Sequence, residues 1–125
     1  MEKEFHRITD SELTIVQCLW DAPTALTMNE ILSQVHARCE WEDSTIKTMV
    51  QRLCTKGVVA KENRGVFYYA PRISREVYSE QATRNLVRQL YRGSAKRLVA
   101  ALVDSELSEE DIDELRAILE EGRGK

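Results

Sequence analysis

The chain has 125 residues, of which 42% are hydrophobic and 31% are charged, and its formal net charge is −3. This composition is typical of a small globular protein and excludes a disordered chain. No apolar run approaches the roughly 18–20 residues of a membrane-spanning helix, and the charged N-terminal segment lacks the apolar core of a secretion signal. These features predict a cytoplasmic protein with no membrane partner.

The charges are segregated along the chain. Residues 44–64 carry five lysine or arginine residues against Glu62 alone, whereas residues 104–121 carry nine acidic residues against Arg116 alone. The basic segment is a candidate for contact with phosphate groups, and the acidic segment is most simply the solvated face of a helix. The acidic segment lacks the glycine and the ligand spacing of an EF-hand calcium loop.

Two capping boxes predict the starts of the first two helices. Thr9 and Glu12 mark the first helix, which should end before Pro23, and Thr27 and Glu30 mark the second. Apolar residues then repeat at intervals of three and four, as expected for amphipathic helices. The predicted buried residues are Leu13, Val16, Leu19 and Trp20 in the first helix, and Ile31, Leu32 and Val35 in the second.

A third helix is predicted to begin at Glu42 or Asp43 and to end at Gly57, a residue suited to a left-handed stop. Its predicted buried face comprises Ile46, Met49, Val50 and Leu53. Residues 58–61 and 66–70 are the only predicted strands, and Arg64-Gly65 between them predicts a hairpin turn. A short basic helix followed at once by a basic hairpin is the order of a winged helix-turn-helix, in which the helix enters the major groove of DNA.

The polar residues of the third helix have the chemistry needed for contact with DNA. Threonine side chains are short enough to approach bases or phosphates, and lysine and arginine side chains reach phosphates or guanine. The predicted DNA-binding residues are Ser44, Thr45, Lys47, Thr48, Gln51 and Arg52 on the helix, and Lys61 and Arg64 on the hairpin. The alternative is that these residues form only the solvated face of a surface helix.

From Ser74 onward the sequence predicts only helices, the last of them capped by Ser108. Short apolar stripes without a sheet cannot bury themselves, so we expect a two-fold homodimer. The predicted dimerisation residues are Val77, Leu86, Leu90, Leu98, Leu102, Ile112, Leu115 and Leu119. The predicted fold is mainly α with a small β-hairpin wing. Residues 1–72 form a winged helix-turn-helix domain and residues 73–125 a helical dimerisation domain.

The sequence offers little for catalysis or metal binding. His6 and His36 lie in different segments, and no glycine-rich phosphate loop or GxSxG motif occurs. The cysteines, Cys18, Cys39 and Cys54, form neither a disulfide framework nor a metal-binding pair. We therefore predict no enzymatic activity, no cofactor and no metal site. Cys18 and Cys54 are predicted to be small core residues, with a redox or metal sensor at Cys39 or Cys54 as the alternative.

Several segments together match one known family. They are residues 12–20, Trp41, residues 44–53, Lys56-Gly57 and Phe67-Tyr68-Tyr69, followed by Tyr91, Gly93, Leu98-Val99, Leu107-Ser108 and residues 112–116. With these segments the chain resembles the penicillinase-repressor family of the BlaI, MecI and CopY type over nearly its whole length. The resemblance implies a dimeric transcriptional repressor that binds a palindromic operator, often that of a β-lactam-resistance or copper-transport operon.

Two departures from the family limit what the resemblance implies. Copper-responsive members end in paired CxC motifs, and no cysteine follows Cys54, so copper sensing by that route is not expected. The β-lactam repressors are released by proteolysis at an Asn-Phe bond, where this chain has Ala101-Leu102. A regulatory protease that cut there would detach the last helix and weaken a dimer that binds two half-sites. The alternative function is a winged-helix adaptor that binds proteins instead of DNA.

Overall fold

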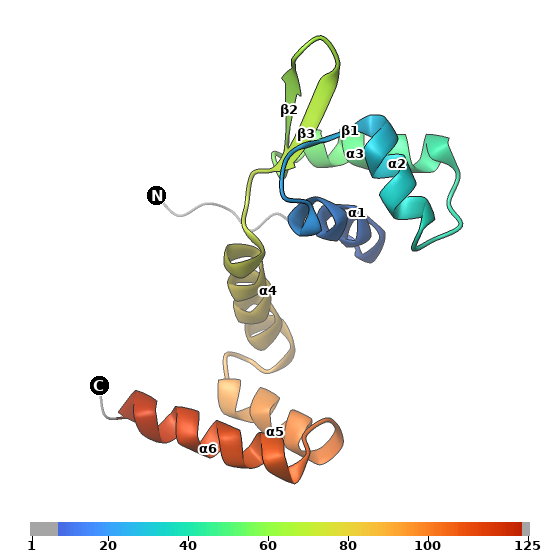
Figure 1. Cartoon of the computed structure of the whole chain (residues 1–125). Helices are drawn as coiled ribbons and strands as arrows, with labels where there is room; N and C mark the ends of the chain where they lie inside the picture. The colour runs from blue at the N-terminus through green and yellow to red at the C-terminus, as the bar shows by residue number, and fades with distance from the viewer. Residues whose placement is uncertain (1–7, 124–125) are drawn as a thin grey trace. The chain divides into compact units, whose positions relative to one another are not determined.

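The computed structural model describes residues 8–123, and the chain divides into two compact units between Gln81 and Ala82. The first unit contains α1 to α3, a small sheet and the start of α4, and the second contains only helical segments in its described part (Figure 1). No helix in residues 8–123 is long and apolar enough to cross a membrane. The predicted domains, residues 1–72 and 73–125, stay a prediction.

Both predicted capping boxes are present at the starts of helices. The Thr9 N–H donates to Glu12 Oε1 at 3.0 Å, and the Glu12 N–H donates to Thr9 Oγ1 at 3.1 Å. Thr27 and Glu30 form the same pair of hydrogen bonds. The three helices of the first unit are α1 (Asp10–Asp21), α2 (Met28–His36) and α3 (Asp43–Thr55). Local side-chain chemistry therefore sets where α1 and α2 begin.

The sheet has three antiparallel strands, so the prediction of only two strands is wrong. The strands are β1 (Leu26–Thr27), β2 (Val59–Asn63) and β3 (Phe67–Pro71), in the order β1-β3-β2. In β1, Leu26 pairs with Tyr69 across the strands. A two-residue strand has no alternation that a sequence pattern could reveal, and Thr27 is also the N-cap of α2.

Two glycines with positive φ shape the hairpin. Gly57, with φ +79°, ends the connection from α3, and Val58 then donates its N–H to the Leu53 carbonyl at 3.0 Å. Gly65, with φ +91°, lies in the turn and donates its N–H to the Asn63 side-chain oxygen at 3.0 Å. Such backbone angles favour glycine. Figure 1 shows the hairpin extending away from α1, α2 and α3.

The core of the first unit lies between its helices and the sheet. The predicted buried faces of α2 and α3 are confirmed. The prediction for α1 is partly wrong, because Glu12 and Ile15 are buried with Val16 and Leu19, whereas Leu13 is only half-buried. Trp20, the other predicted core residue of α1, is half-buried and donates its indole N–H to the Ile73 carbonyl at 2.9 Å.

An ionic cluster ties the start of α4 (Arg75–Leu90) to α1 within the first unit. The Asp21 carboxylate accepts hydrogen bonds from Arg38 at 2.8 Å and from Arg75 at 2.5 Å. The Arg75 guanidinium also lies 5.5 Å from the Trp20 ring. These bonds hold the pKa of the Asp21 carboxyl below its ordinary value.

The second unit contains the end of α4, α5 (Ala95–Ser105) and α6 (Glu109–Arg123). The prediction that Ser108 caps the last helix is confirmed, because Asp111 donates its N–H to Ser108 Oγ at 3.1 Å. None of the side chains in residues 82–122 is buried. These helices therefore form without a core of their own in the described part of this unit.

Candidate nucleic-acid interface

Helix α3 separates its apolar residues from its polar residues. Its four apolar core residues are buried, and all of the residues predicted to contact DNA from this helix are exposed. The exposed set is Ser44, Thr45, Lys47, Thr48, Gln51 and Arg52. With 3.6 residues per turn, these positions cover a wide face and not a single line.

One row of these residues faces α1. Ser44, Thr45, Thr48 and Arg52 line an open hollow of ≈ 430 Å³ together with Met49 of α3 and with Thr9 and Ser11 at the start of α1. The Thr48 hydroxyl donates to the Ser44 carbonyl at 2.9 Å. The hollow is therefore bordered by hydroxyl groups and by one guanidinium.

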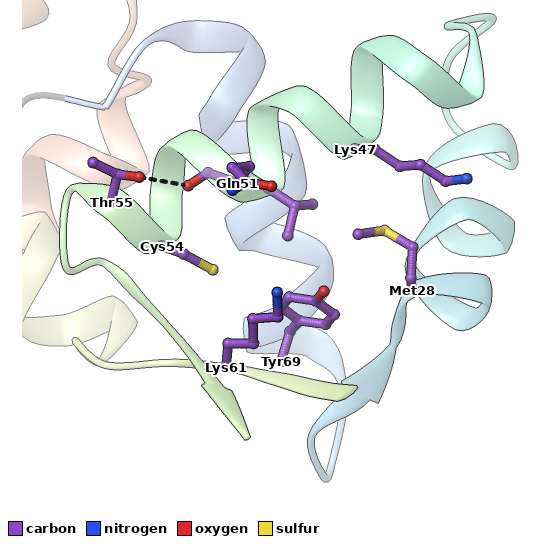
Figure 2. Close-up of a pocket in the computed structure, with 8 residues that line it drawn as sticks. Met28, Lys47, Gln51, Cys54, Thr55, Lys61 and Tyr69 are labelled. Atoms are coloured by element: carbon purple, nitrogen blue, oxygen red, sulfur yellow. Dashed lines mark hydrogen bonds between the residues drawn. The ribbon is translucent and has the colours of Figure 1, made fainter. Parts of the chain in front are cut away.

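The other row faces the hairpin. Lys47, Gln51 and Thr55 line a smaller pocket of ≈ 230 Å³ with Met28, Lys61 and Tyr69 among their neighbours. Figure 2 shows Lys61 and Tyr69 on the hairpin side of this pocket and the hydrogen bond from Thr55 to the Gln51 carbonyl. Lys61 and Tyr69 are direct partners across β2 and β3. The fold thus brings a lysine of the hairpin to the same pocket as Lys47 and Gln51.

The two predicted cations of the hairpin lie on opposite faces of it. Lys61 Nζ is 4.1 Å from the centroid of the Phe67 ring, and the Arg64 guanidinium is 4.8 Å from that of the Tyr68 ring. Consecutive residues of a strand point to opposite faces, so Phe67 and Tyr68 direct these cations to different sides. Arg64 also pairs with Glu62. Lys61 lines the pocket beside α3, and Arg64 is not among the residues that line it.

Glu12 is the residue of this region that sequence reasoning missed, because it was assigned only a capping role. Its side chain is 0% exposed. Glu12 Oε1 accepts hydrogen bonds from Lys56 Nζ at 2.6 Å and from the Thr9 N–H at 3.0 Å. Glu12 Oε2 accepts no hydrogen bond and lies 3.9 Å from Arg52 Nη1.

A sequence signal for this burial exists. Glu12 stands three, four and seven residues before Ile15, Val16 and Leu19, on the buried stripe of α1. Burial raises the pKa of the Glu12 carboxyl, but the hydrogen bonds from Lys56 and Thr9 outweigh burial and hold that pKa below its ordinary value. The carboxylate is therefore charged at neutral pH.

The cysteines bear on the alternative of a redox or metal sensor, which stays a prediction. All of them are free thiols, with Cys18 buried and Cys39 and Cys54 half-buried. Burial raises the pKa of the Cys18 and Cys54 thiols, which disfavours the reactive thiolate. The core prediction is confirmed for Cys18, and Cys54 packs against the core.

The histidines form no metal-binding cluster in the described residues. His36 Nε2 lies 2.6 Å from an Asp43 oxygen, and His6 falls outside the described range. Between residues 8 and 123, no group of three or more histidine, cysteine or acidic side chains could hold a metal ion.

The predicted dimerisation residues are all accessible in the single chain. Leu98, Ile112 and Leu115 are half-buried, and the others are exposed, with Leu90 at 68% and Leu119 at 62%. The predicted cleavage residues, Ala101 and Leu102, are exposed within α5. Their backbone is helical.

Comparison with known proteins identifies the family. The penicillinase repressor family model matches residues 8–121. The chain is 30% identical to the penicillinase repressor of Bacillus licheniformis, over 98% of this chain and 97% of that protein. It is 27% identical to the methicillin resistance regulatory protein MecI of Staphylococcus aureus strain N315, over 95% and 98% of the two chains.

Solved structures identify the fold of the first unit. The DNA-binding domain of the repressor BlaI is 31% identical, with a TM-score of 0.54, over 62% of this chain and 94% of that one. Monomeric Bacillus licheniformis BlaI, solved in complex with the blaP half-operator, is 29% identical with a TM-score of 0.53 and the same coverage. The predicted winged helix is confirmed. With the match spanning nearly its whole length, the chain belongs to the penicillinase repressor family, whose members are transcriptional repressors and not enzymes.

Proposed function

We propose that this chain is a homodimeric transcriptional repressor whose helix α3 reads operator DNA. The observation that carries the proposal is the exposed polar face of α3, flanked by one hollow toward α1 and one pocket toward the hairpin. A related BlaI with the same winged helix has been solved on its half-operator. An arrangement of a groove-reading helix beside a wing supports the same use here.

The two sides of α3 suit different contacts. Lys47 and Lys61 share the pocket beside the hairpin, so both ammonium groups suit phosphates of one backbone segment. Thr48 already donates its hydroxyl hydrogen to Ser44, so toward DNA it offers an acceptor oxygen and a methyl group. Those groups suit a base amino group and the methyl of thymine. On the side of α3 that faces α1, Arg52 adds a guanidinium that suits a phosphate.

Dimerisation belongs to the proposal because the C-terminal helices expose their apolar residues. Leu90, Ile118 and Leu119 are each more than half exposed. A second copy related by a two-fold axis would cover such residues and present two winged helices to a palindrome. We expect the pairing to involve the eight dimerisation residues predicted from the sequence.

Relief of repression by a protease is also part of the proposal. The Ala101-Leu102 bond lies inside α5, and a helical bond must open locally before a protease reaches it. Cleavage would separate α6 from the rest of the chain and reduce two linked half-site contacts to one. The controlled genes, of β-lactam-resistance or another type, follow from the operator once it is located.

The experiment that tests DNA binding is a titration of a labelled duplex from upstream of the gene, at roughly 50 and 200 mM salt. We expect sequence-selective binding that weakens steeply with salt. The double variant Lys47→Ala with Arg52→Ala should lose about 30- to 100-fold in affinity. The slope of log K against log salt concentration should also become shallower by about two units.

The matched control is Lys96→Ala with Arg116→Ala, which removes the same charge from exposed positions of α5 and α6. The control should bind within about threefold of the unchanged protein, since only long-range attraction is reduced. Equal losses in the two double variants would contradict α3 as the DNA-reading element. Failure of the unchanged protein to select any duplex would favour the protein-binding adaptor.

A further inference from the structure

The two capping boxes of the first unit differ in the burial of the glutamate and in its partners. Glu12 and Glu30 make the same reciprocal hydrogen bonds with Thr9 and Thr27. Glu30 is exposed, whereas Glu12 is 0% exposed and bonds to Lys56, which is 44 residues away in the sequence. Capping a helix therefore requires neither burial nor a lysine. The burial of Glu12 has another consequence for the fold.

A buried carboxylate is costly unless cations and hydrogen bonds compensate it. Compensation here is uneven between the two oxygens. Oε1 receives both hydrogen bonds, and Oε2 receives none and faces Arg52 Nη1 at 3.9 Å. At this distance the guanidinium attracts the carboxylate but donates no hydrogen bond to Oε2. Its N–H donors therefore remain available for another acceptor.

The cations that Glu12 attracts both lie at the C-terminal end of α3. Arg52 is in its last turn and Lys56 is its C-cap residue. Lys56 Nζ is held directly, with a side chain only 28% exposed, while the Arg52 side chain is 55% exposed and lines the hollow between α1 and α3. One buried charge thus fixes the end of α3 against α1 and draws Arg52 toward that hollow.

We propose that Glu12 is a positioning residue of the DNA-reading surface, which holds Arg52 in the hollow between α1 and α3 in the orientation that meets a phosphate. This inference rests on the proposed function. Lys56 pairs with Oε1 and so offsets much of the carboxylate charge, and Arg52 lies 3.9 Å from Oε2 without a hydrogen bond to it, which leaves the Arg52 donors available to DNA. Glu12 itself does not touch DNA, and it acts through Arg52.

The sign of the effect separates this inference from simple electrostatics. A negative charge near DNA repels phosphates, so removal of that charge alone would strengthen binding. If Glu12 positions Arg52, removal of its charge weakens binding instead. Glu12→Gln is the suitable change, because glutamine keeps the shape and can still accept the Thr9 N–H of the capping box.

The experiment measures affinity for the upstream duplex between roughly 50 and 200 mM salt by fluorescence anisotropy. For Glu12→Gln we expect about a tenfold loss of affinity and a salt slope smaller by about 0.9, the value of one phosphate contact. Arg52→Ala should show the same loss, and the double variant should lose less than about twofold more, because both changes remove one contact. The control Glu30→Gln removes the same charge from the exposed box and should cause no loss.

Unchanged or stronger binding by Glu12→Gln, with the unchanged protein binding tightly, would overturn the inference and leave the proposed function standing. Additive losses for Glu12→Gln and Arg52→Ala would also overturn it. Absence of DNA binding by the unchanged protein would reject the proposed function and this inference together.

If circular dichroism shows Glu12→Gln to be unfolded, Lys56→Met replaces it. Without Lys56, the carboxylate should draw Arg52 into a direct hydrogen bond and away from DNA. We then expect the same loss of about one unit of salt slope, with little further loss on adding Arg52→Ala. Independent, additive losses from these two changes would overturn the inference in this form as well.

Discussion

The two compact units of this chain reach order in different ways. The first unit buries side chains from α1, α2, α3 and the sheet, including Ile15, Ile31, Ile46 and Leu53 at 0% exposure. The second unit buries none of the side chains between residues 82 and 122. The first unit can therefore be stable by itself. The second is stabilised by interactions within its helices, such as their caps, and, in our proposal, by a second copy.

The largest effect is expected in the core of the first unit. Leu53→Ala removes a fully buried side chain of α3 and should lower the free energy of unfolding by about 3 kcal/mol, from lost burial and the cavity left behind. Urea denaturation followed by circular dichroism measures the change. The same truncation at Leu90, which is 68% exposed, should change the unfolding of the first unit by less than about 0.5 kcal/mol. Similar losses at both positions would contradict the contrast between the units.

A smaller effect is expected on assembly. Leu119→Asp places a charge within the apolar stripe of α6 and should raise the dimer dissociation constant at least about thirtyfold, equivalent to about 2 kcal/mol. Sedimentation equilibrium measures the constant. Ala117→Asp is the matched control, because residue 117 lies on the opposite side of α6 from Leu115 and Leu119 at 100° per residue. A dimer equally weakened by both variants would remove α6 from the proposed interface.

Two glycine substitutions should change stability in opposite directions. Gly57→Ala should destabilise the first unit by about 1 kcal/mol, because φ is +79° there, although an added Cβ meets nothing within 4 Å. Gly122→Ala, in the last turn of α6, should stabilise that helix by a few tenths of a kcal/mol through helix propensity. Thermal unfolding monitored by circular dichroism reports both changes. Stabilisation by Gly57→Ala would show that its backbone does not need the left-handed conformation.

The decrease of the unfolding free energy at acid pH should depend on Glu12. Its folded-state pKa is held below the ordinary 4.5 by Lys56 and Thr9 against the effect of burial. The unfolded chain therefore binds the proton more readily, so the stabilisation is present above about pH 4.5 and is lost as pH falls through the folded pKa. Glu12→Gln should flatten the pH dependence of the unfolding free energy in this range.

Asp21 will keep part of that dependence in Glu12→Gln. Its carboxyl pKa is also lowered, by hydrogen bonds from Arg38 and Arg75. Glu30→Gln is the control for loss of a carboxylate from an exposed capping box. If the unfolding free energy falls identically at acid pH in the unchanged protein and in Glu12→Gln, the role given to the Glu12 charge is contradicted.

Much of the first unit could be predicted because its signals are local. The Thr9 and Thr27 boxes, the buried face of α3 and the stop at Gly57 each depend on residues within a few positions of one another. The strand β1 could not be predicted, because its two residues pair with Tyr68 and Tyr69 far along the chain. The sequence predicts the DNA-binding residues of α3 but does not divide them into groups. Their division between a hollow and a pocket depends on where α1 and the hairpin pack.

The sequence by itself determined the helices and the two hairpin strands, their caps and glycine stops, and the family, because each follows from neighbouring residues or from a pattern spread over the whole chain. Only the tertiary structure decided that Glu12 meets Lys56 across 44 positions and that Trp20 donates to Ile73 across 53. It also placed Lys61 and Arg64 on opposite faces of the hairpin. Such contacts depend on the packing of segments distant in sequence, and in this chain the charges around α3 are arranged by that packing.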